Sequence, residues 1–367
     1  MKIPFFDYRS LFKQNEKNFL EIFSKIGERG AYIMQNDLSD FESNIEKYTG
    51  IKHAIGVANA TDAMQLLLKA GGIGPGDEVI FSSHTFIATA SAIKSTGSTP
   101  IPVESGADHL IDPKAIKKAI TSKTKAILPT QLNGRIANMD EILAIAKEYG
   151  LQIYEDSAQA LGAKYKNQSA GSFGLGGCIS FYPAKTLGCF GDGGMVLTNN
   201  EDIYYKIKLM RDHGRGVDGN VSIWGFNSRL DNLQAAILNF FLKSFDKTIE
   251  RRRYIADLYH EQLKDIDSLR LPPSTNSDQN HFDTYQNYEI ETIKRDQLKM
   301  YLAEKGIGTI IQWGGKAVHE FKDLGFNQSL PFTEKIMKNS LMLPLNMSVT
   351  DEEIKYICKS IRNFFNE

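Results

Sequence analysis

The sequence has little cysteine and no close spacing of metal-ligating residues. The three cysteines, Cys178, Cys189 and Cys358, are an odd number among 367 residues, and without a CxxC pair they do not build a disulfide framework. A reducing compartment is the simplest setting for such a chain, so we expect a cytoplasmic protein. The histidines show no close pairing of the kind that zinc sites use, and we expect no metal.

An excess of charge and a long apolar run are also missing. Lys and Arg number 43 against 44 for Asp and Glu, which gives a net charge of −1. Nucleic-acid binding needs a basic excess, so we expect no nucleic-acid partner. No apolar run approaches the roughly 20 residues that cross a bilayer, and the start, MKIPFFDYRSLFKQNEK, lacks the apolar core of a signal peptide. We therefore expect no membrane partner.

The first 200 residues alternate strand-like apolar runs with amphipathic segments. Helical patterns occupy 61–72 and 139–150 and end at glycines, as helices often do. This alternation predicts an α/β domain around a mostly parallel sheet with helices on both faces. The strand-like runs are 54–60, 77–83, 125–132, 151–158, 177–183 and 194–199.

The pattern changes after about residue 228. Long helical periodicity covers 228–264, and a polar loop follows at 272–282. We expect a strand at 284–293, a helix at 295–306, a strand at 308–313, and a final helix that Thr350 caps with Glu353. These elements predict a large domain over 1–244 and a smaller α+β domain over 245–367. For the basic run 251–253, the solvated face of a helix is favoured over a phosphate clamp.

A single lysine, Lys185, stands in the apolar, glycine-rich stretch ISFYPAKTLGCFGDGG at 179–194. Burying an ammonium is costly, so an amine here either reaches water or has a task. Asp156 ends another strand-like run 29 residues earlier, and parallel strands present their carboxyl ends at one edge. A lysine and an acid at that edge suit pyridoxal phosphate, although a buried ion pair or a solvent-exposed lysine is also consistent with the pattern.

Several motifs in order resemble one enzyme family. EDSAQALGA at 155–163, SFYPAK at 180–185 and GDGG at 191–194 resemble the core of the DegT/DnrJ/EryC1/StrS family of pyridoxal-phosphate-dependent sugar aminotransferases. GIGPGDEVI, HTFIATASAI, RDHGR and NSRLDNLQAAIL also resemble segments of that family. The resemblance covers nearly the whole chain. It implies an aspartate-aminotransferase-like large domain (fold type I) and a transaminase activity.

The resemblance assigns roles around the cofactor ring. Lys185 matches the lysine that binds the cofactor covalently and shuttles the proton, and burial would lower its pKa to suit that task. Asp156 matches the acid that pairs with the ring nitrogen. Gln159 matches the residue that bonds the phenolic oxygen, and Phe86 matches the aromatic that lies against the ring. His84, two residues before Phe86, either faces the site or packs in the core.

The phosphate group of the cofactor has its own matching residues. VANATDAM resembles a strand–turn–helix phosphate loop in which Thr61 offers a hydroxyl and the backbone N–H groups of Ala60 and Thr61 add donors. Many relatives have glycine at the position of Ala60. Ser180 matches a second hydroxyl. Asn227 matches a residue that reaches the phosphate from the other subunit, which implies a homodimer with shared active sites.

The implied reaction moves an amino group, usually from glutamate, to a keto sugar on a nucleoside diphosphate, and 2-oxoglutarate is the other product. A basic group near the cofactor should bind the donor carboxylate and the diphosphate, and Arg229, Arg215 and His319 are the candidates. The segments TQLNGR at 130–135 and IIQWGGKAVHEF at 310–321 depart from the family pattern. The ketone position, C3 or C4, and the identity of the sugar therefore stay open. Surface-glycan or secondary-metabolite synthesis is the expected context.

Three alternatives to a sugar aminotransferase remain. A sugar dehydratase of the same fold would carry histidine in place of Lys185. A non-catalytic regulator could keep the cofactor pocket without the reaction. A nicotinamide oxidoreductase would depend on GSFGLGGC at 171–178, which lacks the acidic residue that a dinucleotide site places about 20 residues later.

Overall fold

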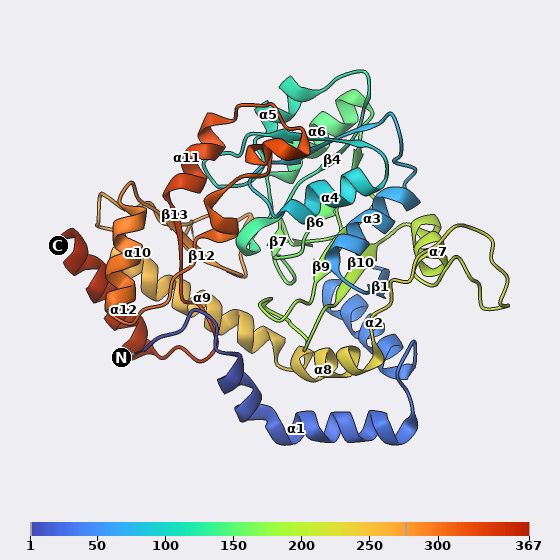
Figure 1. The fold of residues 1–367 in the computed structure, drawn as a ribbon, viewed down its shortest axis with the longest axis horizontal. Coiled ribbons are helices and arrows are strands. Elements are labelled where there is room, and N and C mark those ends of the chain that lie inside the picture. Colours follow the sequence, from blue (N-terminus) through green and yellow to red (C-terminus); the bar gives the residue numbers. More distant parts are fainter. Residues whose placement is uncertain (1, 276, 367) are drawn as a thin grey trace.

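The computed structural model describes residues 2–275 and 277–366, and Figure 1 shows their arrangement. One twisted sheet forms the centre of the larger part. Four strands pair in the parallel order β3-β2-β4-β5 and four in the order β1-β10-β9-β6. The strands are β1 (His53–Val57), β2 (Glu78–Ser82), β3 (Thr99–Val103), β4 (Thr124–Leu128), β5 (Gln152–Ile153), β6 (Glu155–Asp156), β9 (Gly177–Ser180) and β10 (Gly194–Thr198).

The two groups of strands join into a continuous sheet. The amide of Tyr154 donates to Ile127 O at 3.1 Å and that of Asp156 to Pro129 O at 3.0 Å. The β4 strand and its extension thus border both β5 and β6. The β9 strand runs parallel to β6, while β10 runs antiparallel to β9 and β1. The predicted α/β architecture is confirmed, and β3 is a strand that the sequence analysis did not name.

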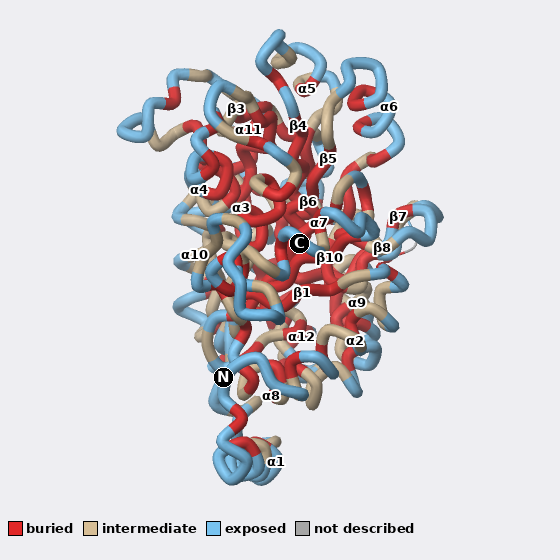
Figure 2. The backbone as a smooth tube through the Cα atoms, turned by 90° about the vertical axis from the view of Figure 1, so that its right-hand side faces the viewer, coloured by how far each residue is buried: buried red, intermediate tan, exposed pale blue. Residues whose placement is uncertain are grey.

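Helices cover both faces of the sheet because its strands alternate apolar side chains between two cores. Val79 and Phe81 pack into one core and Ile80 into the other. Figure 2 shows the buried strands enclosed by partly exposed helices. One face carries α3 (Ala60–Ala70), α4 (Ile87–Ser95) and α7 (Glu201–Met210), and the other carries α2 (Asn36–Thr49), α5 (Pro113–Ala119), α6 (Met139–Tyr149) and α8 (Asn232–Leu242).

The C-terminal part packs helices against a two-stranded antiparallel sheet. Its final helix begins after Thr350, whose hydroxyl accepts from Glu353 N while the Glu353 carboxylate accepts from Thr350 N, so the predicted capping box is confirmed. The elements are α9 (Phe245–Leu263), β12 (Tyr288–Glu291), α10 (Arg295–Glu304), α11 (Pro331–Asn339), β13 (Ser340–Leu343) and α12 (Asp351–Phe365).

The strand expected at 308–313 is wrong. Ile310 makes one isolated bridge to Met342, and a 3-10 turn follows at Gln312–Gly315. Trp313, Gly314 and Gly315 have φ values of 48°, 71° and 75°. Three successive left-handed residues end any extended strand, and the two glycines make that turn accessible.

The predicted domain boundary at 244/245 falls at the start of one long helix. Phe245 and Ile249 at the start of α9 pack with α2 and α8, whereas Ile255 and later residues pack with the C-terminal part. Ile3 also packs there and bridges to Ile307. The first few residues thus cross to the C-terminal part, and the two-domain division stays a prediction.

The basic run 251–253 has a structural role that the sequence analysis did not predict. Arg252 is 7% exposed and donates to the carbonyls of Tyr285, Leu345 and Gln286. Burial lowers its pKa to about 10. The prediction that this run lies on a solvated helix face is therefore wrong for Arg252, which binds backbone carbonyls of the C-terminal part.

The N-terminal helix lies along the outside of the molecule. The α1 helix (Tyr8–Arg29) is capped by Asp7, whose carboxylate accepts from Ser10 N at 3.0 Å, and it extends below α8 in Figure 1. None of the described helices is long and apolar enough to cross a membrane. The remaining short elements are β7 (Lys164–Tyr165), β8 (Gln168–Ser169), β11 (His281–Phe282), η1 (Leu132–Gly134), η3 (Val318–Glu320) and η4 (Lys322–Leu324).

Candidate active site

The structure brings Lys185 and Asp156 together. Lys185 follows β9, and Asp156 ends β6, which runs parallel to β9 with Asp156 opposite Cys178. Burial lowers the pKa of the Lys185 amine to about 8, while the charges of Asp156 and Cys178 act in the opposite direction. The amine is thus desolvated beside a carboxylate at the carboxyl edge of the sheet, where ligands of open α/β sheets bind.

A chain of hydroxyl groups fixes the Asp156 carboxylate. Thr89 Oγ1 donates to Asp156 Oδ2 at 2.7 Å, and Thr85 and Thr89 hydroxyls lie 2.8 Å apart. Thr130 Oγ1 donates to Thr85 Oγ1 at 3.0 Å. Because Thr89 donates its hydroxyl hydrogen to Asp156, Thr85 is the donor to Thr89. The hydrogen bonds therefore run from Thr130 through Thr85 and Thr89 to the carboxylate of Asp156. Ala158 N donates to the other carboxylate oxygen at 3.2 Å.

Glu155, the neighbouring acid, is directed into the core instead. Phe173 N and the Gln131 side chain each donate to its carboxylate at 2.7 Å. Burial nevertheless raises its pKa to about 7. Adjacent residues of a strand face opposite sides, and this separates the structural Glu155 from Asp156 at the site.

Gln286 holds the backbone on both sides of Lys185. Its amide oxygen accepts from Thr186 N and Thr186 Oγ1, each at 2.7 Å, and its amide nitrogen donates to Ala184 O at 2.8 Å. Sequence reasoning missed Gln286, because it lies about 100 residues from Lys185 and in the C-terminal part. No local signal marks it.

A glycine lets the phosphate-loop residues approach the sheet. Gly194, at the start of β10, pairs with Val57 of β1 and Ser180 of β9. A Cβ added to Gly194 would lie 2.3 Å from Asn59 C and 2.6 Å from Ala60 N. The N-terminus of α3 therefore packs directly on the strand that borders Ser180, and only glycine permits this approach.

The first turn of α3 offers unpaired donors at this place. Asn59 caps the helix by accepting from Asp62 N at 2.8 Å, which leaves the N–H groups of Ala60 and Thr61 for a ligand. Ala60 is helical and has no positive φ, so its methyl group causes no backbone strain there. Ser180 is 9% exposed, and its hydroxyl accepts from Tyr182 N.

Gln159 and Phe86 also lie at this edge of the sheet. Gln159 Oε1 accepts from Asn133 N at 2.9 Å and from Asn287 Nδ2 at 3.5 Å, so its amide nitrogen is the end left to donate to a ligand. Phe86, the N-cap residue of α4, is 52% exposed, and its ring centroid lies 6.4 Å from that of Trp313.

The arginine candidates form a cluster around one acid. Arg229 Nη1 donates to Asp212 Oδ1 at 2.9 Å and Arg215 Nη2 to Asp212 Oδ2 at 2.8 Å. Asn227 is exposed and bridges to Asp212 through the backbone. Ser228 Oγ accepts from Ala58 N at 3.3 Å, which places this segment beside the phosphate loop of its own chain.

His319 has no ring nitrogen free for a substrate in this conformation. The ring is fully buried, with Nδ1 at 2.7 Å from Ser83 Oγ and Nε2 at 3.1 Å from Glu334 Oε1. It links the end of β2 to α11. The geometry therefore gives His319 a structural role and does not support the substrate contact that the sequence analysis predicts.

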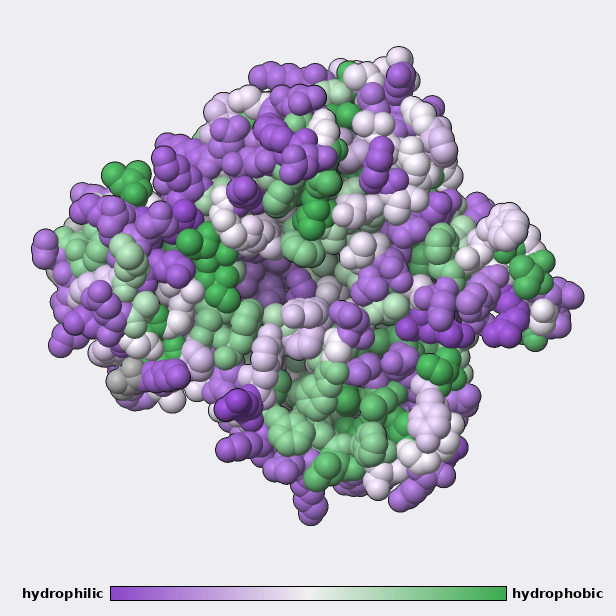
Figure 3. All heavy atoms as spheres, in the orientation of Figure 1, coloured by the Kyte–Doolittle hydropathy of each residue, from purple (hydrophilic) through white to green (hydrophobic). Residues whose placement is uncertain are grey.

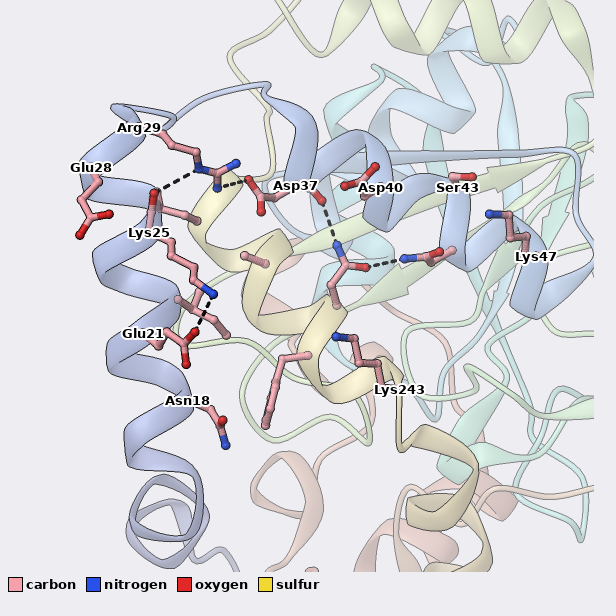
Figure 4. Close-up of a pocket in the computed structure, with 16 residues that line it drawn as sticks. Asn18, Glu21, Lys25, Glu28, Arg29, Asp37, Asp40, Ser43, Lys47 and Lys243 are labelled. Atoms are coloured by element: carbon pink, nitrogen blue, oxygen red, sulfur yellow. Dashed lines mark hydrogen bonds and ion pairs between the residues drawn. The ribbon is translucent and has the colours of Figure 1, made fainter.

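A large groove lies elsewhere, between α1, α2 and α8. It has a volume of about 920 Å³ and mixed charge, and Figure 4 shows its ionic groups facing one another, with Arg29 bound to Asp37 and Lys25 to Glu21. None of the predicted site residues lines it. Lys185 instead lines a smaller pocket that residues of the N-terminal segment, α9 and the C-terminal part also border.

Curated relatives match the whole chain. A dTDP-3-amino-3,6-dideoxy-alpha-D-galactopyranose transaminase from Aneurinibacillus thermoaerophilus is 37% identical over 368 residues, with 99% of each chain covered. A protein of Geobacillus stearothermophilus named pleiotropic regulatory protein is 36% identical over 371 residues, covering 100% of this chain and 99% of that protein.

Solved structures share the complete fold. DesV from Streptomyces venezuelae superposes with a TM-score of 0.95 at 34% identity, covering 100% of this chain and 99% of its own. NtdA from Bacillus subtilis, solved with its bound cofactor PMP, gives a TM-score of 0.92 at 29% identity, with coverage of 100% and 86%.

The family match extends over residues 13–362. Together with the site geometry, it establishes the fold class, the cofactor and the type of reaction that the motifs predict. The chain belongs to the DegT/DnrJ/EryC1/StrS aminotransferase family and is a pyridoxal-phosphate-dependent enzyme of the aspartate-aminotransferase-like fold.

Proposed function

We propose that this enzyme transfers an amino group from glutamate to the C3 ketone of a deoxysugar carried on a nucleoside diphosphate. The observation that carries the proposal is the desolvated amine of Lys185 beside the carboxylate of Asp156, next to the donor groups of α3 and Ser180. Relatives named for 3-amino sugars favour C3: the A. thermoaerophilus transaminase is one of them.

The residues at the site fit pyridoxal phosphate. The N–H groups of Ala60 and Thr61 and the hydroxyls of Thr61 and Ser180 would hold its phosphate, since a helix N-terminus attracts an anion. The close approach that Gly194 allows brings these donors together. Bound there, the cofactor supplies an electron sink and carries the amino group between donor and acceptor.

The protein residues supply the proton chemistry. With its pKa lowered, Lys185 holds a substantial neutral fraction near pH 8 and can take and return the proton at the substrate carbon. Asp156, fixed by Thr89, would keep the ring nitrogen protonated. Gln159 would donate to the phenolic oxygen, and Phe86 would cover one face of the ring.

Arg229 and Arg215 remain our candidates for binding the donor carboxylate and the diphosphate. Both guanidinium groups share Asp212, which offsets part of their positive charge. A substrate anion would therefore bind the N–H groups that each arginine has left.

We also propose that the active unit is a cytoplasmic homodimer. Trp224 is 96% exposed, and Val217 and Val221 are exposed on the same loop, which projects beyond α7 at the right of Figure 1. Apolar residues also gather over α1 and α8 at the bottom of Figure 3. Leu20 and Phe23, both on α1, are exposed. Exposed apolar patches of this kind mark association surfaces. The three cysteines are free, which suits a reducing compartment.

A regulatory role without catalysis is the alternative, and the name of the Geobacillus relative suggests it. Lys185, Asp156, Thr61 and Ser180 together favour the enzyme, because they combine groups that would bind the cofactor with an amine that can transfer a proton. A dehydratase would lack the lysine.

The test is turnover with glutamate and a panel of dTDP- and UDP-linked 3-keto and 4-keto sugars. We expect 2-oxoglutarate to form with a 3-keto sugar, with the new amine at C3 by NMR. The Lys185→Ala variant serves as the control for uncatalysed exchange. Amination of only the 4-keto sugars would overturn the C3 assignment, and binding of sugar without any amine transfer would overturn the transaminase role.

A further inference from the structure

Three side chains from distant parts of the sequence meet near the cofactor site. His84 follows β2, His109 lies in the loop between β3 and α5, and Glu289 is in β12. One ligand atom from each lies within 4.8 Å of the others. His84 is 0% and Glu289 is 4% exposed, so this is a buried cluster.

Several polar atoms in the cluster have no partner. Among the described residues, both ring nitrogens of His84 and Oε1 of Glu289 are buried and make no hydrogen bond of good geometry, although the backbone of His109 interacts with the His84 ring. His84 Nε2 lies 3.9 Å from Glu289 Oε1, which is too long for a hydrogen bond. Leaving three buried polar atoms unpaired costs free energy, so the geometry indicates that a bridging atom belongs between the two side chains.

The surroundings hold the other atoms of the cluster in place. His109 Nδ1 lies 2.8 Å from Glu289 Oε2, and Asn133 Nδ2 donates to the same oxygen at 2.9 Å. The far nitrogen of His109 lies 2.8 Å from Glu291 Oε1. A histidine whose second nitrogen binds a carboxylate is the usual arrangement behind a metal ligand, because it fixes the ring and raises its basicity.

We propose that His84, His109 and Glu289 form a zinc site. Two imidazoles and one carboxylate suit Zn²⁺ better than Mg²⁺ or Ca²⁺, which prefer oxygen ligands alone. The ion replaces the hydrogen between His109 Nδ1 and Glu289, and that proton passes to solvent. Bonds of about 2.0–2.1 Å in tetrahedral geometry separate two ligand atoms by roughly 3.4 Å. His84 and Glu289, at 3.9 Å, would approach by about half an ångström, and His109 and Glu289, at 2.8 Å, would separate by about as much.

The site has access and a position for a fourth ligand. His109, Glu289 and Glu291 line a pocket of about 370 Å³, from which a water molecule can complete the coordination. The ion would connect β12 of the C-terminal part to the segment that leads into Phe86. The sequence analysis expects no metal because these residues lie far apart in the chain. The inference does not depend on the identity of the sugar.

The test measures zinc bound to the holoenzyme after treatment with a chelator and removal of free cofactor by gel filtration. Zn²⁺ alone is then added, and bound metal is measured after dialysis. We expect one zinc per chain and a higher melting temperature with zinc. His84→Ala and Glu289→Gln should each weaken zinc binding at least 100-fold, and Glu291→Gln should weaken it 10–100-fold.

His53→Ala is the matched control, because His53 pairs with a single carboxylate, Glu201, at 2.9 Å. It should bind zinc as the wild type does. Circular dichroism checks the folding of each variant, and Glu291→Gln, which removes no ligand, decides the outcome if His84→Ala does not fold. Absence of stoichiometric zinc in the wild type would overturn the proposal. Equal zinc binding by the wild type and His84→Ala would also overturn it. If His84→Ala does not fold, equal zinc binding by the wild type and Glu291→Gln would do so.

Discussion

Lys185 shows how burial at one residue sets its reactivity. Removal of its amine from water disfavours the charged form, while the charge of Asp156 only partly restores it. With a pKa of about 8, half of the amine is neutral at pH 8, whereas an exposed lysine with a pKa of about 10.4 is neutral to well under 1%. A neutral amine is both the nucleophile and the base that transamination requires.

We predict that the cofactor-free protein reacts at Lys185 with an amine-selective acylating reagent in a pH-dependent way, with an apparent pKa of about 8. The rate should rise through pH 7 to 9 and then level off, because protonation below the pKa removes the lone pair. Mass spectrometry of the modified peptide measures the rate, and the exposed Lys359 on α12 is the internal reference. A Lys185 rate that rises in parallel with that of Lys359 would show that its amine is solvated.

Asp156→Asn should reduce the rate of the glutamate half-reaction at least 100-fold and change cofactor affinity much less. The amide still accepts the Thr89 hydrogen bond, but it carries no negative charge to stabilise the protonated ring nitrogen. Absorbance kinetics and cofactor titration separate the two effects. Glu155→Gln is the neighbouring control, which should lose stability but keep its half-reaction rate, and a normal rate in Asp156→Asn would contradict the assigned role.

At the scale of elements, the approach of α3 to the sheet forms the phosphate site. Gly194→Ala should weaken cofactor binding at least tenfold, because its Cβ would lie 2.3 Å from Asn59 C and backbone must move. Overpacking of this kind also costs about 1–3 kcal/mol of stability. Gly74→Ala, where a Cβ meets nothing within 4 Å, should bind normally. Equal affinity of the two variants for pyridoxal phosphate would contradict this account of the site.

Elements with a strong local pattern could be predicted from the sequence. The apolar run 194–199 became β10, and Thr350 with Glu353 marked the start of α12. The run 308–313 has equally suitable residues, yet the φ values of Trp313 and the glycines after it bend the chain. Apolar periodicity does not reveal such a turn, because glycine and tertiary packing decide it.

The candidate site could be predicted only in part, because local sequence patterns do not reveal contacts that tertiary packing creates. The motifs indicated Lys185 and Asp156, but Thr89 and Gln286 act through contacts across 67 and 100 residues. His319 matched a motif position, although burial against Ser83 and Glu334 gives both of its ring nitrogens protein partners. The motifs therefore identified the functional side chains at the strand ends. The residues that hold these side chains in place could be found only from the folded structure.

At the scale of the whole molecule, the segment after Asn227 turned out to face inward. Leu230 and Ile237 pack in the chain's own core, where they are 0% and 4% exposed. The exposed apolar groups are instead Trp224 on the preceding loop and Leu20 and Phe23 on α1. These are the surfaces we expect a second copy to cover.

We predict that mixing Lys185→Ala with an Asn227 variant restores part of the activity. Asn227→Ala should loosen the cofactor by one to two orders of magnitude, since each lost charge-assisted bond is worth about 1.5–3 kcal/mol. The assay therefore uses limiting cofactor, or Asn227→Phe as a stronger block. In a mixed dimer one site receives both intact residues if Asn227 serves the partner.

The control for this experiment is subunit exchange, which differently tagged copies report. Recovery of activity together with exchange supports the shared site. Exchange without recovery would place Asn227 in the site of its own chain, where Ser228 already contacts Ala58, and a fully active monomer by sedimentation would contradict the dimer.

The most direct test of the central claim is a single-turnover reaction of the holoenzyme with glutamate, followed by its visible absorption. We predict that the yellow colour of the wild type disappears, that 2-oxoglutarate forms in an amount equal to the sites, and that a keto sugar nucleotide restores the colour. Lys185→Ala, folded by circular dichroism, should show none of these three changes at a measurable rate. A wild type that keeps its colour with every amino donor, or a Lys185→Ala variant within tenfold of the wild-type rate, would contradict the claim that this site performs transamination.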